Sequence, residues 1–305
     1  MQAHQERRLA GPPHQAVAWT HLQGPDESEL GQVLRHYDIS WSTSAETYRA
    51  TFDRYPEFYY VRFYGFAASD PRDLMIAVPV HVVVKSKVVI SWCPRPVTAV
   101  DSVARKVDAH PDLIHNAHTL IFYLLDEIVE DTFPVLDVFN DRLAIIEHDV
   151  FAPGPRQRAI QQGIFRLKRE ILTLRHIVAS ERDVSYQLVR YWDTIDDKSE
   201  SREWTFQLYD HVIRLFESAD IYRELANSVL DIYLGSVSNR LNEIVKKLTL
   251  VTVLFVPASL VAALYGMNFD YLPGQHHPWG FFLVVGGVFL ISLTLLAIFR
   301  QRRWL

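Results

Sequence analysis

Two long runs of apolar residues lie near the carboxyl terminus, at 248–265 (LTLVTVLFVPASLVAALY) and 281–299 (FFLVVGGVFLISLTLLAIF). At 1.5 Å per residue, each is long enough to cross a hydrocarbon layer of about 30 Å. We therefore predict a first transmembrane helix at 248–269, a loop at 270–279, a second transmembrane helix at 280–300 and a basic tail at 301–305. Two buried core helices are the alternative, but so short a loop leaves little surface for a soluble fold.

The charges that flank these runs predict their orientation. Lys246 and Lys247 precede the first run, and Arg300, Arg302 and Arg303 follow the second. The connecting loop contains no Lys or Arg. Because positive charge is retained on the cytoplasmic side, both termini should be cytoplasmic and the loop external.

The first hundred residues carry the pattern of a small α/β domain, for which we take the limits 1–111. Aromatic and β-branched residues fill 58–66, 74–84 and 87–92, which are separated by short polar breaks. This pattern is typical of an antiparallel meander or of hairpins. An earlier strand is predicted at 15–22, followed by a helix at 26–36. Pro79 inside the second of the three strands predicts a sheet edge or a bulge.

Long helices are predicted for the next part of the chain, which we delimit as a stalk domain at 112–247. There is no proline between Pro155 and Pro257. We expect a helical pair at 113–150 interrupted at Pro134, a long helix at 156–191, and a second one that begins near Arg202 after a polar turn.

Small and polar residues recur at intervals of four and three along this last helix and into the first apolar run. They are Asp220, Glu224, Asn227, Asp231, Gly235, Ser238, Asn242, Val245, Thr249, Thr252, Val256, Ser259 and Ala263. Such spacing places them on one face of a helix, where a coiled coil would carry large apolar residues. A polar face that enters a membrane fits a water-filled axis surrounded by several copies of the helix.

Two helices per chain cannot enclose such an axis, so this interpretation requires a homo-oligomer with the first transmembrane helix inside and the second facing lipid. The alternative is that the small residues let helices approach closely, while the acidic residues form a solvated face.

Composition excludes two classes of function. The 305 residues include 31 Lys and Arg against 36 Asp and Glu, so the net charge of −5 offers no general surface for nucleic acid. The single cysteine, Cys93, excludes an internal disulfide and a multi-thiolate zinc site. No catalytic motif is present, and His110, His115 and His118 lack a matching thiol or carboxylate. We therefore predict that the chain is not an enzyme.

At the end of the first apolar run the chain reads Tyr265-Gly266-Met267-Asn268-Phe269, which resembles the signature of the CorA metal-ion transporter family. The likeness extends over DIYLGSVSNRLNEIVKKLTLVTVLFVPASLVAALYGMNFDYLP (231–273) and the terminal RQRRWL (300–305). It is strong over about the last 75 residues and looser before them.

The resemblance implies an α+β membrane protein: a cytoplasmic α/β domain, long stalk helices and two carboxy-terminal transmembrane helices, assembled as a funnel-shaped homopentamer in the plasma membrane. It implies uptake of Mg²⁺, and of Co²⁺ and Ni²⁺, with no organic cofactor. Gly266, Met267 and Asn268 would form the selectivity filter, because side-chain and backbone carbonyls can recognise a hydrated Mg²⁺ ion without stripping its water. The implied pore-lining residues are Asn242, Val245, Leu248, Thr249, Thr252, Val256, Ser259 and Ala263.

The resemblance also implies gating by intracellular Mg²⁺ held between subunits. Asp231 matches the stalk position of such a metal site, and Asp70 or Asp73 would supply the partner carboxylate. For Asp70 and Asp73 the turn chemistry of SDPRD is an equal alternative.

The loop departs from the family pattern. Many magnesium-transporting members carry Met-Pro-Glu-Leu after the signature, whereas this chain has Leu-Pro-Gly-Gln at 272–275. Asp270 is the only acidic residue left there, and His276 and His277 offer imidazoles that suit Zn²⁺ better than Mg²⁺. A solvated loop is the other interpretation of the two histidines. A ZntB-like transporter that moves Zn²⁺ with protons is therefore one alternative, and a non-conducting membrane-anchored scaffold is another.

Overall fold

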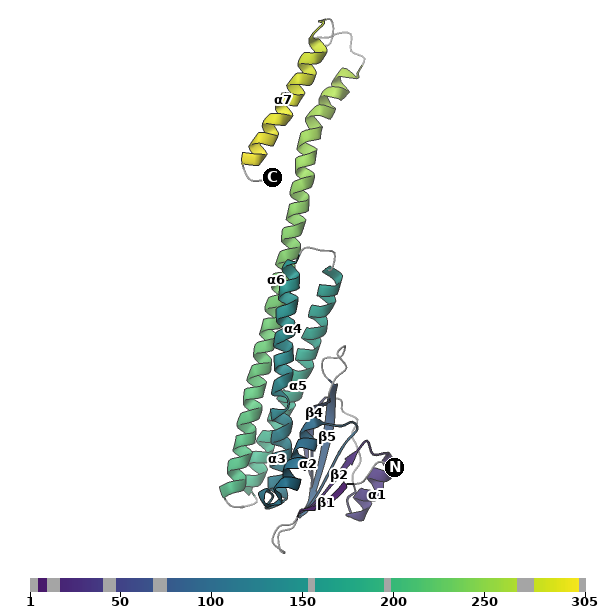
Figure 1. Ribbon diagram of the computed structural model, residues 1–305, viewed down its shortest axis with the longest axis vertical. Coiled ribbons are helices and arrows are strands. Elements are labelled where there is room, and N and C mark those ends of the chain that lie inside the picture. Colours follow the sequence, from purple (N-terminus) through teal and green to yellow (C-terminus); the bar gives the residue numbers. More distant parts are fainter. Residues whose placement is uncertain are drawn as a thin grey trace. The chain divides into compact units, whose positions relative to one another are not determined.

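The computed structural model describes residues 5–9, 17–40, 48–67, 76–152, 157–194, 199–267 and 277–301. Contacts divide the chain into two units, Met1–Asp231 and Ile232–Leu305. The domain limits proposed from the sequence stay a prediction. Helices and strands follow in the order β1 (Gln5–Leu9), β2 (Val17–Gln23), α1 (Glu27–His36), β3 (Thr51–Arg54), β4 (Tyr59–Ala67), β5 (Ile76–Lys85), β6 (Val88–Cys93), α2 (Thr98–Ala109), a 3₁₀ turn (Pro111–Leu113), α3 (Ala117–Glu130), α4 (Phe133–Phe151), α5 (Gln157–Thr194), α6 (Ser199–Tyr265) and α7 (Gly280–Gln301) (Figure 1).

The first unit contains a six-stranded sheet in the order β1-β2-β6-β5-β4-β3. The predicted antiparallel meander is confirmed, since β4 pairs with β5 and β5 with β6 in antiparallel register. Strands β1 and β3, at the two edges of the sheet, and helix α2 were not predicted from the sequence. The parallel pairing of β2 with β6 was not predicted either.

Pro79 does not lie in an edge strand, because β5 is flanked by β4 and β6. Its partner on β4 is Tyr64, but the paired residues of β5 and β6 run only from His81 to Lys85. Pro79 therefore lies beyond the end of the ladder with β6, where its missing N–H costs no hydrogen bond on that side. The strand is interior, but around Pro79 it is paired only with β4 and not with β6.

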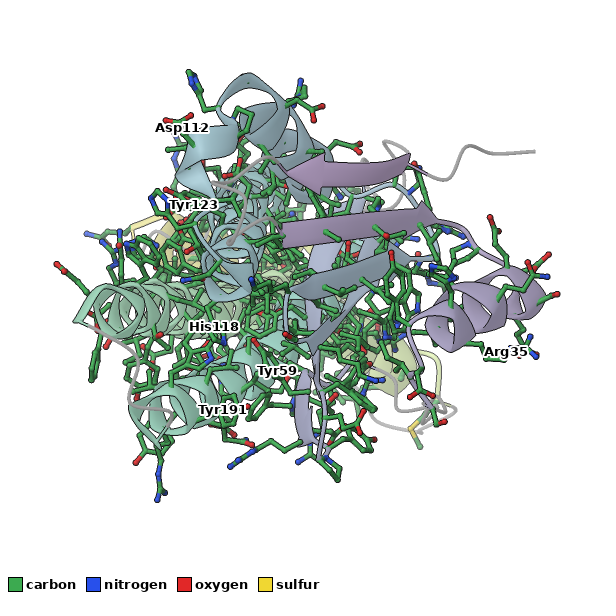
Figure 2. All side chains as sticks on the ribbon, turned by 90° about the horizontal axis from the view of Figure 1, so that it is seen from below. Arg35, Tyr59, Asp112, His118, Tyr123 and Tyr191 are labelled. Carbon is green, nitrogen blue, oxygen red and sulfur yellow. The ribbon has the colours of Figure 1, made fainter. Side chains whose placement is uncertain are left out.

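Helices cover both faces of the sheet. On one face, α1 packs through Val33 and Leu34 into a core with Tyr60, Val83 and Ile90. On the other face, α2 and α3 contact β4, and α5 contacts the edge strand β3. Figure 2 shows Arg35 of α1 on one side of the sheet, and His118 of α3 with Tyr191 of α5 on the other.

The long helices lie close to their predicted limits. The break expected at Pro134 is confirmed: α3 ends at Glu130, and α4 begins at Phe133 with Pro134 in its first turn. A proline is tolerated there because the first helical N–H groups have no partner within the helix. Helix α5 ends at Thr194 and α6 begins at Ser199, slightly before the predicted start.

Two neighbouring residues of α5 attach it to the edge of the sheet. Ser180 Oγ accepts a hydrogen bond from the Ala50 amide at 2.8 Å, and Glu181 Oε1 accepts one from the Tyr64 amide at 2.9 Å. Strand β3 begins only at Thr51, so both amides would otherwise lack a ladder partner on this side. The side chains of α5 thus replace strand hydrogen bonds at this corner of the sheet.

Gly65 marks the closest approach between the sheet and the start of α2. A Cβ atom at this position would overlap Cγ1 of Val97. We expect Gly65→Ala to lower the free energy of unfolding by about 1–3 kcal/mol, because either the strand or α2 must shift. The matched control is Gly163→Ala on α5, where the nearest atom is 3.8 Å away. This control should raise stability by up to about 1 kcal/mol. Denaturant unfolding followed by circular dichroism measures both, and equal effects would contradict the packing argument.

Glu181 predicts a pH dependence of stability. Its side chain is 2% exposed, and burial raises the pKa of its carboxyl to about 8, although the Tyr64 amide opposes the shift. Because the folded state holds the proton more tightly, this stabilisation is complete below the ordinary Glu pKa and is lost as pH rises through about 8. Between the ordinary Glu pKa and pH 8, the free energy of unfolding of the wild type should fall by roughly 1.4 kcal/mol per pH unit relative to that of Glu181→Gln. Unfolding midpoints between pH 5 and 9 test this, and parallel profiles for the two proteins would refute it.

Candidate functional site

The two apolar runs both form helices in the second unit. Helix α6 continues without a break from Ser199 to Tyr265 and contains Pro257, and α7 covers Gly280–Gln301. Both are long and apolar enough to cross a membrane, and their apolar windows are almost entirely unburied within the chain. Helices that expose such surfaces are stable in lipid but not in water, which supports the two predicted spans.

The predicted pore-lining positions fall on one exposed face of α6. All of them are exposed in the single chain: Asn242, Val245, Leu248, Thr249, Thr252, Val256, Ser259 and Ala263. The less exposed residues of the same segment are Leu250, which is buried, and Val253, Leu254, Pro257, Ala258 and Val261. At 100° per residue, these two sets lie on nearly opposite sides of the helix. The second unit thus leaves the polar face uncovered, together with the neighbouring apolar residues Val251 and Phe255.

Two threonines of the exposed face bond back to their own helix. Thr249 Oγ1 donates to the Val245 carbonyl at 2.8 Å, and Thr252 Oγ1 donates to the Leu248 carbonyl at 2.9 Å. With the hydrogen used internally, the hydroxyl oxygens offer only acceptor lone pairs outward, which suits a cation or its water shell. Thr294 on α7 makes the same bond to Leu290, so the bond alone does not identify a pore residue.

At the amino-terminal end of the polar face, the structure differs from the prediction that Asp220 is open to a central axis. Asp220 is not open to an axis, because Oδ1 accepts hydrogen bonds from Arg175 Nε of α5 at 2.6 Å and from Arg223 Nε at 2.9 Å. These partners hold the pKa of the Asp220 carboxyl below its usual range. The continuously exposed part of the face begins at Asp231. The i,i+3 spacing of Asp220 and Arg223 was visible in the sequence, but the role of Arg175, 45 positions away, was not.

Helix α6 ends immediately before the predicted filter. The Gly266 amide donates to the Ala262 carbonyl at 2.9 Å, and a Cβ atom on Gly266 would lie 3.2 Å from that same oxygen. Glycine therefore allows the chain to leave the helix while its last amide bond is kept. Met267 is exposed. Asn268, the third predicted filter residue, lies outside the described residues, so the geometry of the filter stays a prediction.

Of the residues predicted for regulation, Asp231 lies in the described part of the chain. Asp231 is exposed on α6, and none of the hydrogen bonds or ion pairs described for the chain involves its carboxylate. Asp70 and Asp73 lie outside the described residues. Among the described residues, no group of three or more His, Cys, Asp or Glu side chains is placed to hold a metal ion.

The loop between α6 and α7 contributes one described histidine. Nδ1 of His277 accepts the Trp279 amide at 3.3 Å, and its carbonyl accepts the Gly280 amide at 2.9 Å, where α7 begins. His277 therefore caps a helix start. Asp270 and His276 lie outside the described residues. Of the three histidines considered for catalysis, His118 packs against the rings of Tyr59 and Trp192, whereas His110 and His115 are exposed.

Comparisons with known proteins agree with this architecture. A family model described as "CorA-like Mg2+ transporter protein" matches residues 14–303. The cobalt/magnesium transport protein CorA of Thermotoga maritima is 31% identical over 189 residues, which make up 62% of this chain and 53% of that protein. The match thus spans about half the length of that relative.

Two solved structures share the fold. The complete structure of the CorA magnesium transporter from Methanocaldococcus jannaschii has a TM-score of 0.82 at 24% identity, over 95% of this chain and 92% of that one. The cytoplasmic domain of ZntB from Vibrio parahaemolyticus has a TM-score of 0.53 at 14% identity, over 73% of this chain and 88% of that one. The amino-terminal α/β domain, the long helix and the apolar carboxy-terminal helices together match the full-length fold.

Proposed function

Because the chain belongs to the family of CorA-like Mg²⁺ transporter proteins, we propose that it takes up Mg²⁺, and also Co²⁺ and Ni²⁺, through a homopentameric, funnel-shaped channel in the plasma membrane. It is a membrane protein of a divalent-cation transporter family and not an enzyme. Family membership alone does not give the oligomer, the orientation with both termini in the cytosol, or the passage of the ion along the exposed face of α6. These three points are proposed.

The observation that carries the proposal is the exposed polar face on an apolar helix. Asn242, Thr249, Thr252 and Ser259 all lie on the side of α6 that the rest of the unit leaves open. Polar groups facing lipid are costly, so copies of the same helix are the natural cover for them. Five such faces around one axis would give acceptor oxygens at successive levels, with Val245, Leu248 and Val256 as apolar constrictions that close the pore by dewetting.

The filter would lie where α6 ends. A ring of Asn268 amide oxygens with Gly266 carbonyls offers neutral acceptors to a hydrated Mg²⁺ ion. Neutral oxygens favour passage, because a ring of full charges would hold a divalent ion too tightly.

Two alternatives have specific support. Zn²⁺ transport coupled to protons is supported by the likeness to the ZntB cytoplasmic domain, by the missing loop glutamate and by His276 and His277. The capping bond that His277 makes to Trp279 weakens a metal role for it. A membrane-anchored scaffold would explain the helices but not the polar face.

Ion flux into liposomes that hold the purified protein tests these options, and the Thr252→Val and Thr294→Val variants form a matched pair. We expect Mg²⁺ entry that does not depend on a pH gradient. Both threonines are exposed and make the same back-bond, but only Thr252→Val should reduce flux, by about tenfold if one acceptor ring is lost. Zn²⁺ entry driven by the gradient would favour the zinc alternative, and sealed vesicles would favour the scaffold. Equal effects of the two variants would remove Thr252 from the ion path.

Asp231 provides the test of gating. We propose that its carboxylate binds regulatory Mg²⁺ with Asp70 or Asp73 of a neighbouring subunit and holds the pore closed. The substitution Asp231→Asn removes the charge and should raise the internal Mg²⁺ concentration needed for half-inhibition by about tenfold, since one ligand charge is lost. Glu243→Gln, at an exposed acid of the same helix that does not belong to the polar face, is the control. Unchanged inhibition in Asp231→Asn would remove this residue from the regulatory site.

A further inference from the structure

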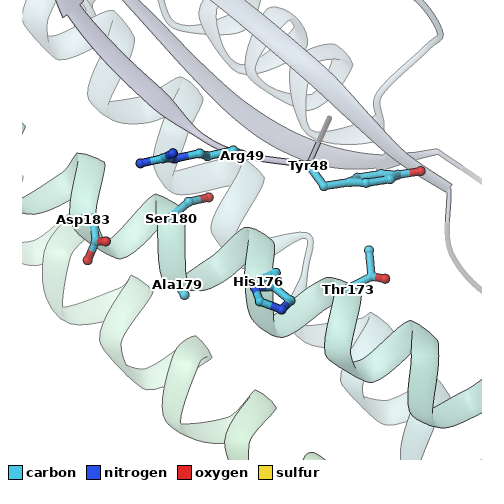
Figure 3. A pocket seen from close by; sticks show the side chains of 7 residues that line it. All are labelled: Tyr48, Arg49, Thr173, His176, Ala179, Ser180 and Asp183. Carbon is cyan, nitrogen blue, oxygen red and sulfur yellow. The ribbon is translucent and has the colours of Figure 1, made fainter. Parts of the chain in front are cut away.

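A groove runs along α5 beside residues 48–54, at the edge of the sheet. The residues that line it are distant in sequence from those of the proposed ion path. One cavity in the groove has a volume of about 460 Å³, and an adjoining cavity of about 260 Å³ shares three of its lining residues. Figure 3 shows the lining of the first: Tyr48, Arg49, Thr173, His176, Ala179, Ser180 and Asp183. The size is typical of small-molecule sites.

The backbone that presents Arg49 is held in place from three directions. The Arg49 amide donates to Tyr64 Oη at 3.2 Å, and its carbonyl accepts a hydrogen bond from Arg62 Nε at 3.0 Å. The next amide, of Ala50, donates to Ser180 Oγ at 2.8 Å on the opposite wall of the groove. These bonds fix the base of the Arg49 side chain relative to α5, so the guanidinium is positioned at low entropic cost.

Tyr48 is held in an unusual conformation at the same place. Its φ of 60° lies in the left-handed region, which is costly for a bulky side chain. The residue is 46% exposed and lines the cavity. Strain of this kind persists where the surrounding contacts enforce it, and it gathers at binding sites. In Figure 3 the Tyr48 ring lies on the side of the cavity where Thr173 and His176 are found.

The cavity offers positive charge and free donors. Within the described part of the chain, neither the Arg49 guanidinium nor the His176 imidazole makes a hydrogen bond or an ion pair. Asp183 is the one acidic lining residue, and its charge is offset by Arg182 at 2.9 Å. A solvated surface arginine would also lack partners, but Arg49 stands on a fixed backbone at the wall of a cavity. A planar guanidinium in this setting matches a phosphate group.

We propose that this cavity binds a nucleoside phosphate. The phosphate is held by Arg49, and the base lies against the rings of Tyr48 and His176. The small side chain of Ala179 leaves the floor open between these two ends. A ligand that carries only a phosphate would use Arg49 but not Tyr48, and a ligand that carries only a base would do the reverse.

Calorimetric titration of the full-length protein in detergent tests this with three probes: AMP, adenosine and inorganic phosphate. AMP binds Mg²⁺ weakly, so depletion of the transported ion does not confuse the measurement. We expect AMP to bind at least about tenfold more tightly than either fragment, because its two ends are recognised together. AMP binding no tighter than phosphate binding would mean an anion surface without base recognition, and would overturn the proposal.

Variants separate the two ends of the site. Arg49→Gln should weaken AMP binding by about tenfold or more and leave adenosine binding unchanged, because it removes the charge-assisted contact. Tyr48→Asn should weaken AMP and adenosine alike and leave phosphate binding unchanged. Asparagine is chosen because it tolerates the left-handed backbone.

Arg158→Gln is the matched control, since it removes the same charge from an exposed position of α5 outside the cavity. It should leave AMP affinity unchanged. The proposal fails if AMP does not bind at concentrations up to about 10 mM, if Arg49→Gln binds AMP like the wild type, or if Arg158→Gln weakens binding as much as Arg49→Gln. None of these outcomes depends on ion transport, so the pocket can fail while the proposed function stands.

Discussion

The structure depends on the backbone hydrogen bonding of α6, which is helical throughout although Pro257 has no N–H to donate. In lipid every amide and carbonyl needs a partner inside the protein, so a single chain can enter the membrane only as a helix. Helix α6 has 67 residues, and it joins a polar segment to an apolar one without a loop. Side-chain donors follow the same requirement, as Thr249 and Thr252 show by bonding to carbonyls of the previous turn. What remains unsatisfied is the acceptor side of these groups, and that side faces outward.

Helix α5 links the sheet to the part of α6 that lies in the first unit. At one position it replaces strand hydrogen bonds through Ser180 and Glu181. One and a half turns earlier, Arg175 holds Asp220 of α6, and the guanidinium groups of Arg175 and Arg182 both lie over the ring of Phe216. Charged contacts of this kind fix orientation more than they add stability, because each desolvated charge offsets part of the gain. The register of α6 against α5 is thus specified by a few polar contacts, whereas apolar packing supplies most of the stability.

The sequence predicted the elements whose signal is local. The spans, β4 to β6, the break at Pro134 and the polar face of α6 all follow from periodicity or from a single proline. Strand β3 was missed because TFDR is short and polar, and it is a strand only through its pairing with β4. Helix α2 was missed although its buried residues Ala99, Val100, Val103 and Val107 have helical spacing. Pairings across long stretches of chain, such as β2 with β6 or Arg175 with Asp220, leave no local pattern.

The same limit explains why periodicity predicted which residues of α6 share a face but not that Asp220, at the amino-terminal end of this face, is paired. Periodicity states which residues share a face, but it does not state what covers that face. The surroundings of this face differ between Asp220 and Asp231. Asp220 is bound by Arg175 of α5, whereas Asp231 and the residues of the face that follow it in the sequence are exposed. An acidic residue that is already paired by arginine is a poor ligand for a divalent cation, because the metal would have to displace that partner. An unpaired carboxylate offers its full charge. Glu224, on the same face, has the Arg223 guanidinium 3.7 Å from its carboxylate. Asp231, for which no such partner is described, is therefore the acid of this face that a cation would bind at least cost.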